Sequence, residues 1–98
     1  MRFARARGQR LDIAYDILKV SEDGELITHI VYKSNINSRL VAKYVETLTE
    51  LGMLYKKEPR YGPPLYKTTE KGILFVRSYE SIKSVFDPKA KLLLASQH

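Results

Sequence analysis

The side chains that could do chemistry in this sequence are basic and aromatic rather than nucleophilic or metal-binding. The chain has no cysteine, which excludes a disulfide framework and cysteine-based zinc sites. Apart from the C-terminal residue, His29 is its one histidine. A lone histidine more often lies at a surface or in packing than acts as a base or a ligand. With no paired carboxylates and no glycine-rich phosphate motif, the sequence predicts a protein that is not an enzyme and needs no metal or cofactor.

Positive charge is concentrated in two stretches. The chain has 17 Lys and Arg against 11 Asp and Glu, a formal charge of +6, which favours a polyanionic partner such as nucleic acid or an acidic membrane surface. Residues 1–10 hold four arginines and no acid, and residues 53–72 hold five basic and two acidic residues. No apolar run approaches the roughly 20 residues of a membrane span, and no signal peptide follows the basic start. We expect a cytoplasmic, nucleoid-associated protein without a membrane partner.

One short run has the residue types that contact base edges in a DNA major groove. Short polar and basic side chains on the first two turns of a helix can reach those edges. Arg39 suits bidentate hydrogen bonding to guanine, whereas Ser38 and Lys43 suit phosphate equally well. An ordinary solvated helix face is the alternative, which Glu46 and Glu50 favour. The candidate residues are Asn37, Ser38, Arg39, Ala42 and Lys43.

A second candidate set surrounds the proline-rich stretch EPRYGPPLYK, residues 58–67. The Pro63–Pro64 pair lacks backbone donors and favours extended geometry, while Gly62 supplies the freedom that a turn needs. This predicts a stiff loop with a basic, aromatic tip that suits a phosphate or minor-groove contact. A rigid solvated loop without a partner is the alternative. The candidate residues are Lys56, Lys57, Arg60, Tyr61 and Lys67.

The N-terminal segment, residues 1–8, is predicted to be a basic, flexible arm because it has little to bury. Arginines on such an arm suit a narrow A·T-rich minor groove. A solvated tail without a role is the alternative. The candidate residues in and beside this arm are Arg5, Arg7 and Arg10.

Four helices and a hairpin are predicted to position these residues. Apolar residues at helical spacing predict the helices, and short segments rich in tyrosine and threonine predict the hairpin. Side chains of Thr28, Asn37 and Thr69 are expected to cap the second, third and fourth helices. Gly52 suits the left-handed position after the third helix, and Leu26–Ile27 suits a very short strand. The predicted helices cover residues 9–20, 29–34, 38–51 and 70–86, and the hairpin covers residues 53–69.

This order of elements is that of a winged helix-turn-helix, with the hairpin as the wing. The predicted fold class is mainly α with a small antiparallel β-sheet: a winged helix-turn-helix core over residues 9–72 and an extended C-terminal helix over residues 69–86. Residues 87–98 are expected to form a short helix or tail. In this arrangement the helix over residues 37–51 enters the major groove and the wing over residues 58–65 contacts the backbone or minor groove.

Two stretches, YKSNINSRLVAKYVETLTELGML and LYKTTEKGILFVRSYE, resemble the small archaeal winged-helix proteins that are predicted transcriptional regulators, the ArnR-like family. The resemblance covers residues 9–86 and rests on the Tyr-Lys-x-Asn turn, the Lys43–Tyr44 pair and the Thr-Glu-Lys-Gly helix start. It implies DNA binding through the third helix and, in several members, dimerisation through the C-terminal helix. The sequence departs from the family pattern at Leu40 and in its longer, proline-rich wing tip.

The C-terminal helix has an apolar seam with coiled-coil-like spacing. Its first half can pack on the first helix, whereas its second half extends beyond a minimal core and needs another cover. A twofold partner is the simplest cover, and Leu92–Leu94 would share it. The candidate dimer-interface residues are Phe75, Tyr79, Ile82, Val85 and Phe86.

Three functions fit this combination. The leading interpretation is a homodimeric DNA-binding transcriptional regulator whose partner is double-stranded DNA, with no small-molecule ligand indicated. The first alternative is an architectural, chromatin-type DNA-binding protein with little sequence preference. The second is a winged-helix module that binds protein, against which the basic arm and wing argue.

Overall fold

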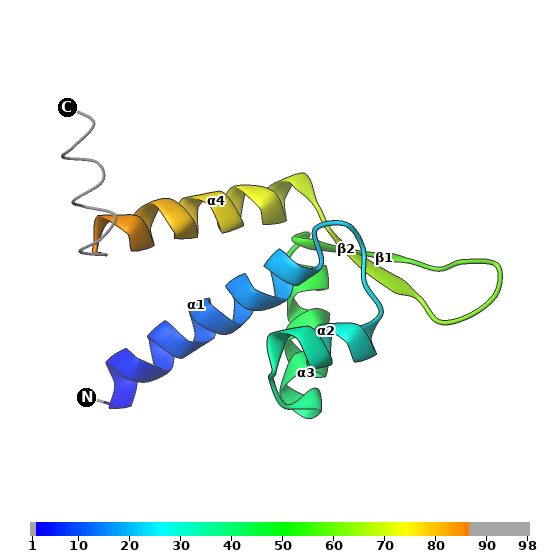
Figure 1. The fold of residues 1–98 in the computed structure, drawn as a ribbon, viewed down its shortest axis with the longest axis horizontal. Helices are drawn as coiled ribbons and strands as arrows, with labels where there is room; N and C mark the ends of the chain where they lie inside the picture. Colours follow the sequence, from blue (N-terminus) through cyan, green and yellow to red (C-terminus); the bar gives the residue numbers. More distant parts are fainter. Residues whose placement is uncertain (1, 87–98) are drawn as a thin grey trace.

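A computed structural model describes residues 2–86, with side chains described from Arg10 onward. In this part of the chain four helices accompany one two-stranded antiparallel sheet, so the predicted winged helix-turn-helix fold class is confirmed (Figure 1). The predicted short helix or tail over residues 87–98 lies outside the described residues. The elements are α1 (Arg2–Val20), α2 (Ile27–Ser34), α3 (Ser38–Glu50), β1 (Leu54–Lys57), β2 (Leu65–Thr68) and α4 (Glu70–Val85).

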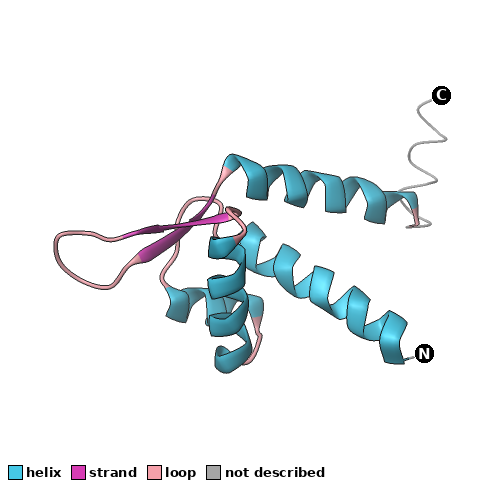
Figure 2. Ribbon diagram, turned by 180° about the vertical axis from the view of Figure 1, so that it is seen from behind, coloured by secondary structure: helices cyan, strands magenta, loops and turns pink. Residues whose placement is uncertain are grey.

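The hydrophobic core lies where α1, α2 and α3 meet. Ile17 of α1, Ile30 of α2 and Val41 of α3 are fully buried, and Val76 of α4 closes the core from the other side. Burying an aliphatic side chain of this size stabilises a fold by about 1.5–3 kcal/mol. Helix α1 therefore lies between α4 and the helix-turn-helix, as both ribbon views show (Figure 2).

The wing is joined to the core through buried hydroxyl groups. The Thr68 hydroxyl donates to the Leu18 carbonyl oxygen at 2.6 Å, and the Ser21 hydroxyl donates to the Ile17 carbonyl oxygen at 2.7 Å. The Thr68 amide also donates to the Ser21 carbonyl oxygen at 3.0 Å. Because a buried polar group without a partner is costly, the two bonds of Thr68 hold the base of the wing against the end of α1, and the Ser21 hydroxyl bond closes the end of α1 itself.

Glu25 pairs with strand β2 of the wing through an isolated antiparallel bridge. Glu25 donates its amide to the Tyr66 carbonyl oxygen at 2.9 Å and accepts from the Tyr66 amide at 2.8 Å. The strand predicted at Leu26–Ile27 is therefore one bridge at Glu25. This pairing fixes the backbone just before Leu26, and α2 begins at Ile27.

Two of the three predicted helix caps are confirmed. The Asn37 side chain accepts from the amides of Arg39 and Leu40, and Thr69 accepts from the amide of Gly72. The cap predicted at Thr28 is wrong, because α2 starts two residues earlier than predicted, at Ile27, and its N-cap, Leu26, has no side-chain hydrogen bond. Tertiary pairing at Glu25, rather than local side-chain capping, sets the start of this helix.

Helix α1 is longer than predicted. Its backbone is helical from Arg2 and continuous with the helix expected from Gln9, so the prediction of a separate flexible arm over residues 1–8 is corrected. Arginine and alanine are strong helix formers. Extending a helix that is already anchored in the core avoids the cost of a new nucleus, which offsets the poor helix propensity of Gly8.

Candidate nucleic-acid interface

The helix-turn-helix directs one face of α3 into the core and the other to solvent. The turn is opened by Asn35 in the left-handed conformation (φ 56°), whose amide donates to the Val31 carbonyl oxygen at 3.0 Å. Val41, Val45 and Leu48 are buried on the inner face of α3. The outer face is thereby held rigidly in place for a partner.

The predicted base-contacting residues lie exposed at the N-terminal end of α3. Arg39, Ala42 and Lys43 are exposed, as is Ser38. Asn37 is also exposed, but its Oδ1 atom accepts from two backbone amides at 2.8 and 3.2 Å. The Asn37 side chain is therefore first a helix cap, with its NH₂ group left for a partner.

The wing projects away from the helices (Figure 1). In β1 only Leu54 is buried, and the next three residues are exposed. Gly62 adopts φ 92° at the tip, as the predicted turn requires, and the neighbouring Tyr61 ring is 84% exposed. The remaining predicted wing residues, Lys56, Lys57, Arg60 and Lys67, are exposed as well.

The cations of α3 and the wing lack carboxylate partners in the part of the chain that the structure describes. Lys19 pairs with Glu80 at 3.2 Å, and Lys33 pairs with Glu25. No such ion pair involves a basic residue of α3 or the wing. These exposed cations are therefore not engaged by a carboxylate within the described chain, and they are available to an anionic partner.

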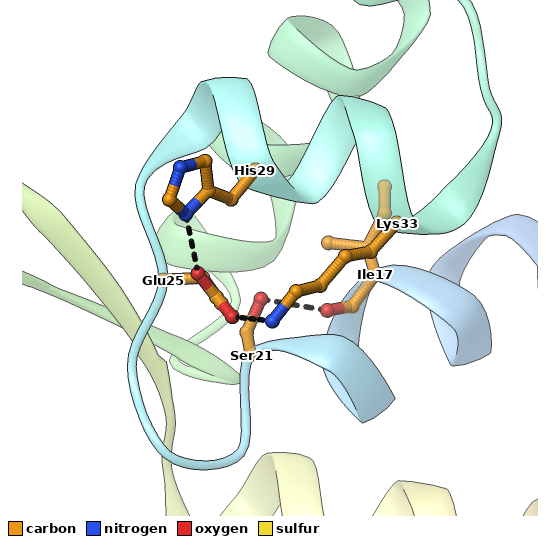
Figure 3. A network of polar contacts seen from close by, with 5 residues as sticks. All are labelled: Ile17, Ser21, Glu25, His29 and Lys33. Atoms are coloured by element: carbon orange, nitrogen blue, oxygen red, sulfur yellow. Dashed lines mark hydrogen bonds and ion pairs between the residues drawn. The ribbon is translucent and has the colours of Figure 1, made fainter.

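A polar network locks α2 to the wing. Lys33 donates to the Glu25 carboxylate, and His29 Nδ1 lies 3.2 Å from the other Glu25 oxygen (Figure 3). The hydrogen bond from Lys33 holds the pKa of Glu25 below its usual range. Since the Glu25 backbone also pairs with Tyr66, this residue ties α2, the preceding loop and β2 together. His29 is exposed and contacts Glu25, which agrees with the expectation of a surface histidine.

Two grooves of about 410 Å³ each flank α3 and differ in charge. The groove between α3 and the wing, here the wing groove, has the charged lining residues Glu46, Glu50 and Lys56. The groove between α3 and α1, here the basic groove, is lined by Arg10, Leu40, Lys43, Tyr44 and Thr47. The packing of α1 against α3 places Arg10 beside α3. Spacing along the sequence could not predict this neighbourhood, because it depends on how the two helices pack.

Two of the predicted dimer-interface residues, Phe75 and Tyr79, are half-buried by contacts within the described chain. The Tyr79 ring stacks on Tyr15 of α1 with centroids 4.7 Å apart, and Phe75 packs against the core. The Tyr15 hydroxyl donates to Glu80, which raises the pKa of Tyr15 to about 12. Contacts within the chain therefore cover part of both side chains, and their place in an interface with another chain stays a prediction.

The other predicted interface residues lie exposed at the end of α4, without a cover from the described part of the chain. Ile82, Val85 and Phe86 are 62%, 64% and 80% exposed. The two ribbon views show α1 and α4 diverging toward this end, so α1 cannot cover these side chains (Figure 2).

Residues 2–86 contain neither a candidate metal site nor a candidate membrane span. No group of three or more histidine or acidic side chains is placed to hold a metal ion there. None of the helices in that range combines the length and the apolar composition needed to cross a bilayer.

The comparisons with known proteins agree with this architecture. The family described as winged helix-turn-helix matches residues 7–87. Sso10a-2, a DNA-binding protein from Sulfolobus solfataricus, has a similar structure, with a TM-score of 0.69 and 27% identity over 89% of this chain and 87% of that one. BpsR of Bordetella bronchiseptica, whose DNA binding is regulated by 6-hydroxynicotinic acid, shares the fold. Its TM-score is 0.60 and its identity 17%, over 87% of this chain and 69% of that one. No curated protein sequence matches significantly. The narrower resemblance to the ArnR-like family stays a prediction.

Proposed function

Because the chain belongs to the winged helix-turn-helix family, we propose that it binds duplex DNA as a transcriptional regulator. The observation that carries this proposal is the set of exposed cations on α3 and the wing, which form no ion pair with a carboxylate of the described residues. The description of Sso10a-2 as a DNA-binding protein supports the same function. A nucleoid-associated location follows from it.

In the proposed complex α3 lies in the major groove and the wing lies on the backbone or in the minor groove. Arg39 is the candidate for reading guanine, and the small Ala42 side chain allows close approach to a thymine methyl group. Lys43 and the wing cations bind phosphates, which supplies affinity and orientation more than sequence selectivity. Each side chain thereby has a role that can be tested separately.

We further propose that the end of α4 mediates a homodimer. Ile82, Val85 and Phe86 form an apolar surface that the described chain leaves uncovered, and a second copy would bury it around a twofold axis. In such a dimer two α3 helices would address half-sites about one helical turn apart, about 34–36 Å. A twofold-symmetric DNA motif is the expected consequence.

Binding by fluorescence anisotropy, combined with selection from a random duplex library, tests the proposal. We expect Arg39→Ala to weaken binding to the selected sequence by about 1–3 kcal/mol and to relax its base preference. Arg60→Ala should weaken binding to all sequences equally and lower the slope of log affinity against log salt by about 0.9. Arg77→Ala, an exposed cation on α4, is the matched control.

The results separate the alternative functions. Absence of duplex binding at low salt would exclude DNA binding, and a stoichiometric protein partner would then favour a protein-interaction module. Equal affinity for random and selected duplexes would indicate an architectural DNA-binding protein. A strong preference for the selected site supports the regulator.

A further inference from the structure

The basic groove combines cations from two helices that are distant in sequence. Arg10 comes from α1 and Lys43 from the outer face of α3, and both line one groove of about 410 Å³. None of the side chains lining this groove is acidic. A groove lined by two cations suits an anionic partner, and its lining has no negative charge that would repel one.

The wing groove on the other flank of α3 has the opposite character. Glu46 and Glu50 line it beside a single cation, Lys56. A phosphate strand that followed this flank closely would meet two carboxylates, which is unfavourable at short range. The two flanks of α3 are therefore not equivalent toward a polyanion, and the basic groove is the favoured path for a phosphate backbone.

Arg10 is held in position by the fold. It lies one helical turn before Ala14, which is buried in the core, on a helix that is continuous on both sides of it. A charged group on an anchored helix loses less conformational freedom on binding than one on a flexible arm. The geometry therefore favours a contact from a fixed position by Arg10 over a contact made by a flexible arm.

We propose that Arg10 of α1 and Lys43 of α3 together bind the phosphate backbone of one DNA strand in the basic groove. This inference rests on the proposed DNA binding and adds α1 to the elements that contact DNA. It also reassigns Arg10, because the minor-groove role expected of a flexible arm is replaced by a phosphate contact beside the major groove. The wing and α1 then hold the duplex on the two flanks of α3.

The test measures affinity for a random duplex across a salt titration, using Arg10→Gln, Lys43→Gln and the double variant. Each single variant should lower the slope of log affinity against log salt by about 0.9, whereas Arg10→Lys should restore it. Because the two cations share one groove, the loss in the double variant should differ from the sum of the single losses. Arg10→Gln combined with Arg60→Gln of the wing should be additive.

Arg77→Gln is the charge-matched control, and circular dichroism checks that each variant folds. Arg10 is exposed, so its substitution should leave the melting temperature unchanged. If wild-type protein binds and Arg60→Gln weakens it while Arg10→Gln behaves like Arg77→Gln, the basic-groove assignment is wrong and the proposed function stands. If wild-type protein does not bind duplex DNA at all, the proposed function itself has failed.

A comparison of A·T-rich and G·C-rich duplexes separates the two roles of Arg10. A phosphate contact predicts an equal loss of affinity on both duplexes for Arg10→Gln. A larger loss on the A·T-rich duplex would place Arg10 in a narrow minor groove and overturn the assignment.

Discussion

The Tyr15 hydroxyl donates a 2.6 Å hydrogen bond to the Glu80 carboxylate and so joins α1 to α4. The same tyrosine stacks on Tyr79, and Lys19 pairs with the same carboxylate at 3.2 Å. This contact holds α4 against α1 and covers part of Tyr79, whereas Ile82, Val85 and Phe86 beyond it are exposed.

We expect Tyr15 to titrate at higher pH than an ordinary tyrosine. The hydrogen bond to Glu80 is the largest cause of its raised pKa of about 12, against an ordinary value of about 10. A raised folded-state pKa means that the stabilisation is complete below about pH 10 and is lost as pH rises through about 12. Ultraviolet absorption of tyrosinate in native protein measures this directly. Tyr15→Phe should remove the highest-pH step, and Glu80→Gln should move that step toward ordinary values; a native titration unchanged by Tyr15→Phe would contradict the assignment.

The Glu25 network should stabilise the fold at neutral pH and fail in acid. The hydrogen bond from Lys33 lowers the pKa of the Glu25 carboxyl in the folded protein. The stabilisation is therefore present above the ordinary glutamate pKa of about 4.3 and is lost as pH falls through the lower pKa of the folded state. Thermal unfolding should show wild-type protein melting above Glu25→Gln at neutral pH, with the difference vanishing in acid. Asp23→Asn, an exposed acid in the same loop, should show no such pattern. Equal melting of wild type and Glu25→Gln at neutral pH would refute this role.

Substitution of Asn37 should separate capping from DNA contact. Asn37→Ala removes the acceptor for two amides and should lower the free energy of unfolding by about 0.5–2 kcal/mol. Asn37→Asp keeps a good N-cap but places negative charge at the proposed interface, so stability should persist while DNA affinity falls. Urea unfolding and anisotropy measure the two effects. Ser38→Ala is the control for stability, and an Asn37→Ala variant as stable as wild type would rule out the cap.

The uncovered end of α4 should control the oligomeric state. Ile82→Asp and Phe86→Asp place charges in the proposed apolar interface and should shift a dimer to a monomer, because a buried unpaired charge is costly. Both positions are exposed within the described chain, so the fold should survive. Leu74→Asp, an exposed apolar position near the start of α4, is the matched control. Light scattering measures the molar mass and so the oligomeric state. A monomeric wild-type protein would exclude this interface, and so would Ile82→Asp and Phe86→Asp variants that remain dimeric.

The sequence by itself determined the features whose physical cause is local. The caps at Asn37 and Thr69 bond to amides two or three residues ahead, and Gly52 adopts its left-handed turn at φ 78°. Helical spacing likewise placed Leu40, Val41, Tyr44, Val45, Leu48 and Leu51 on the inner face of the third helix. Val41, Val45 and Leu48 are buried there, Leu40 and Tyr44 are half-buried, and Leu51 at the helix end is 49% exposed. Such features depend on residue type and near neighbours, so a single sequence is enough to predict them.

Only the tertiary structure decided the features that depend on residues distant in sequence. The pairing of Glu25 with Tyr66 set the start of α2 against the expectation at Thr28, and the stacking of Tyr15 on Tyr79 partly covered that face of α4. The packing of α1 beside α3 brought Arg10 into one groove with Lys43. The physical reason is the same in each case: spacing along the chain shows which face of an element is apolar or charged, but the approach of another element decides what that face meets.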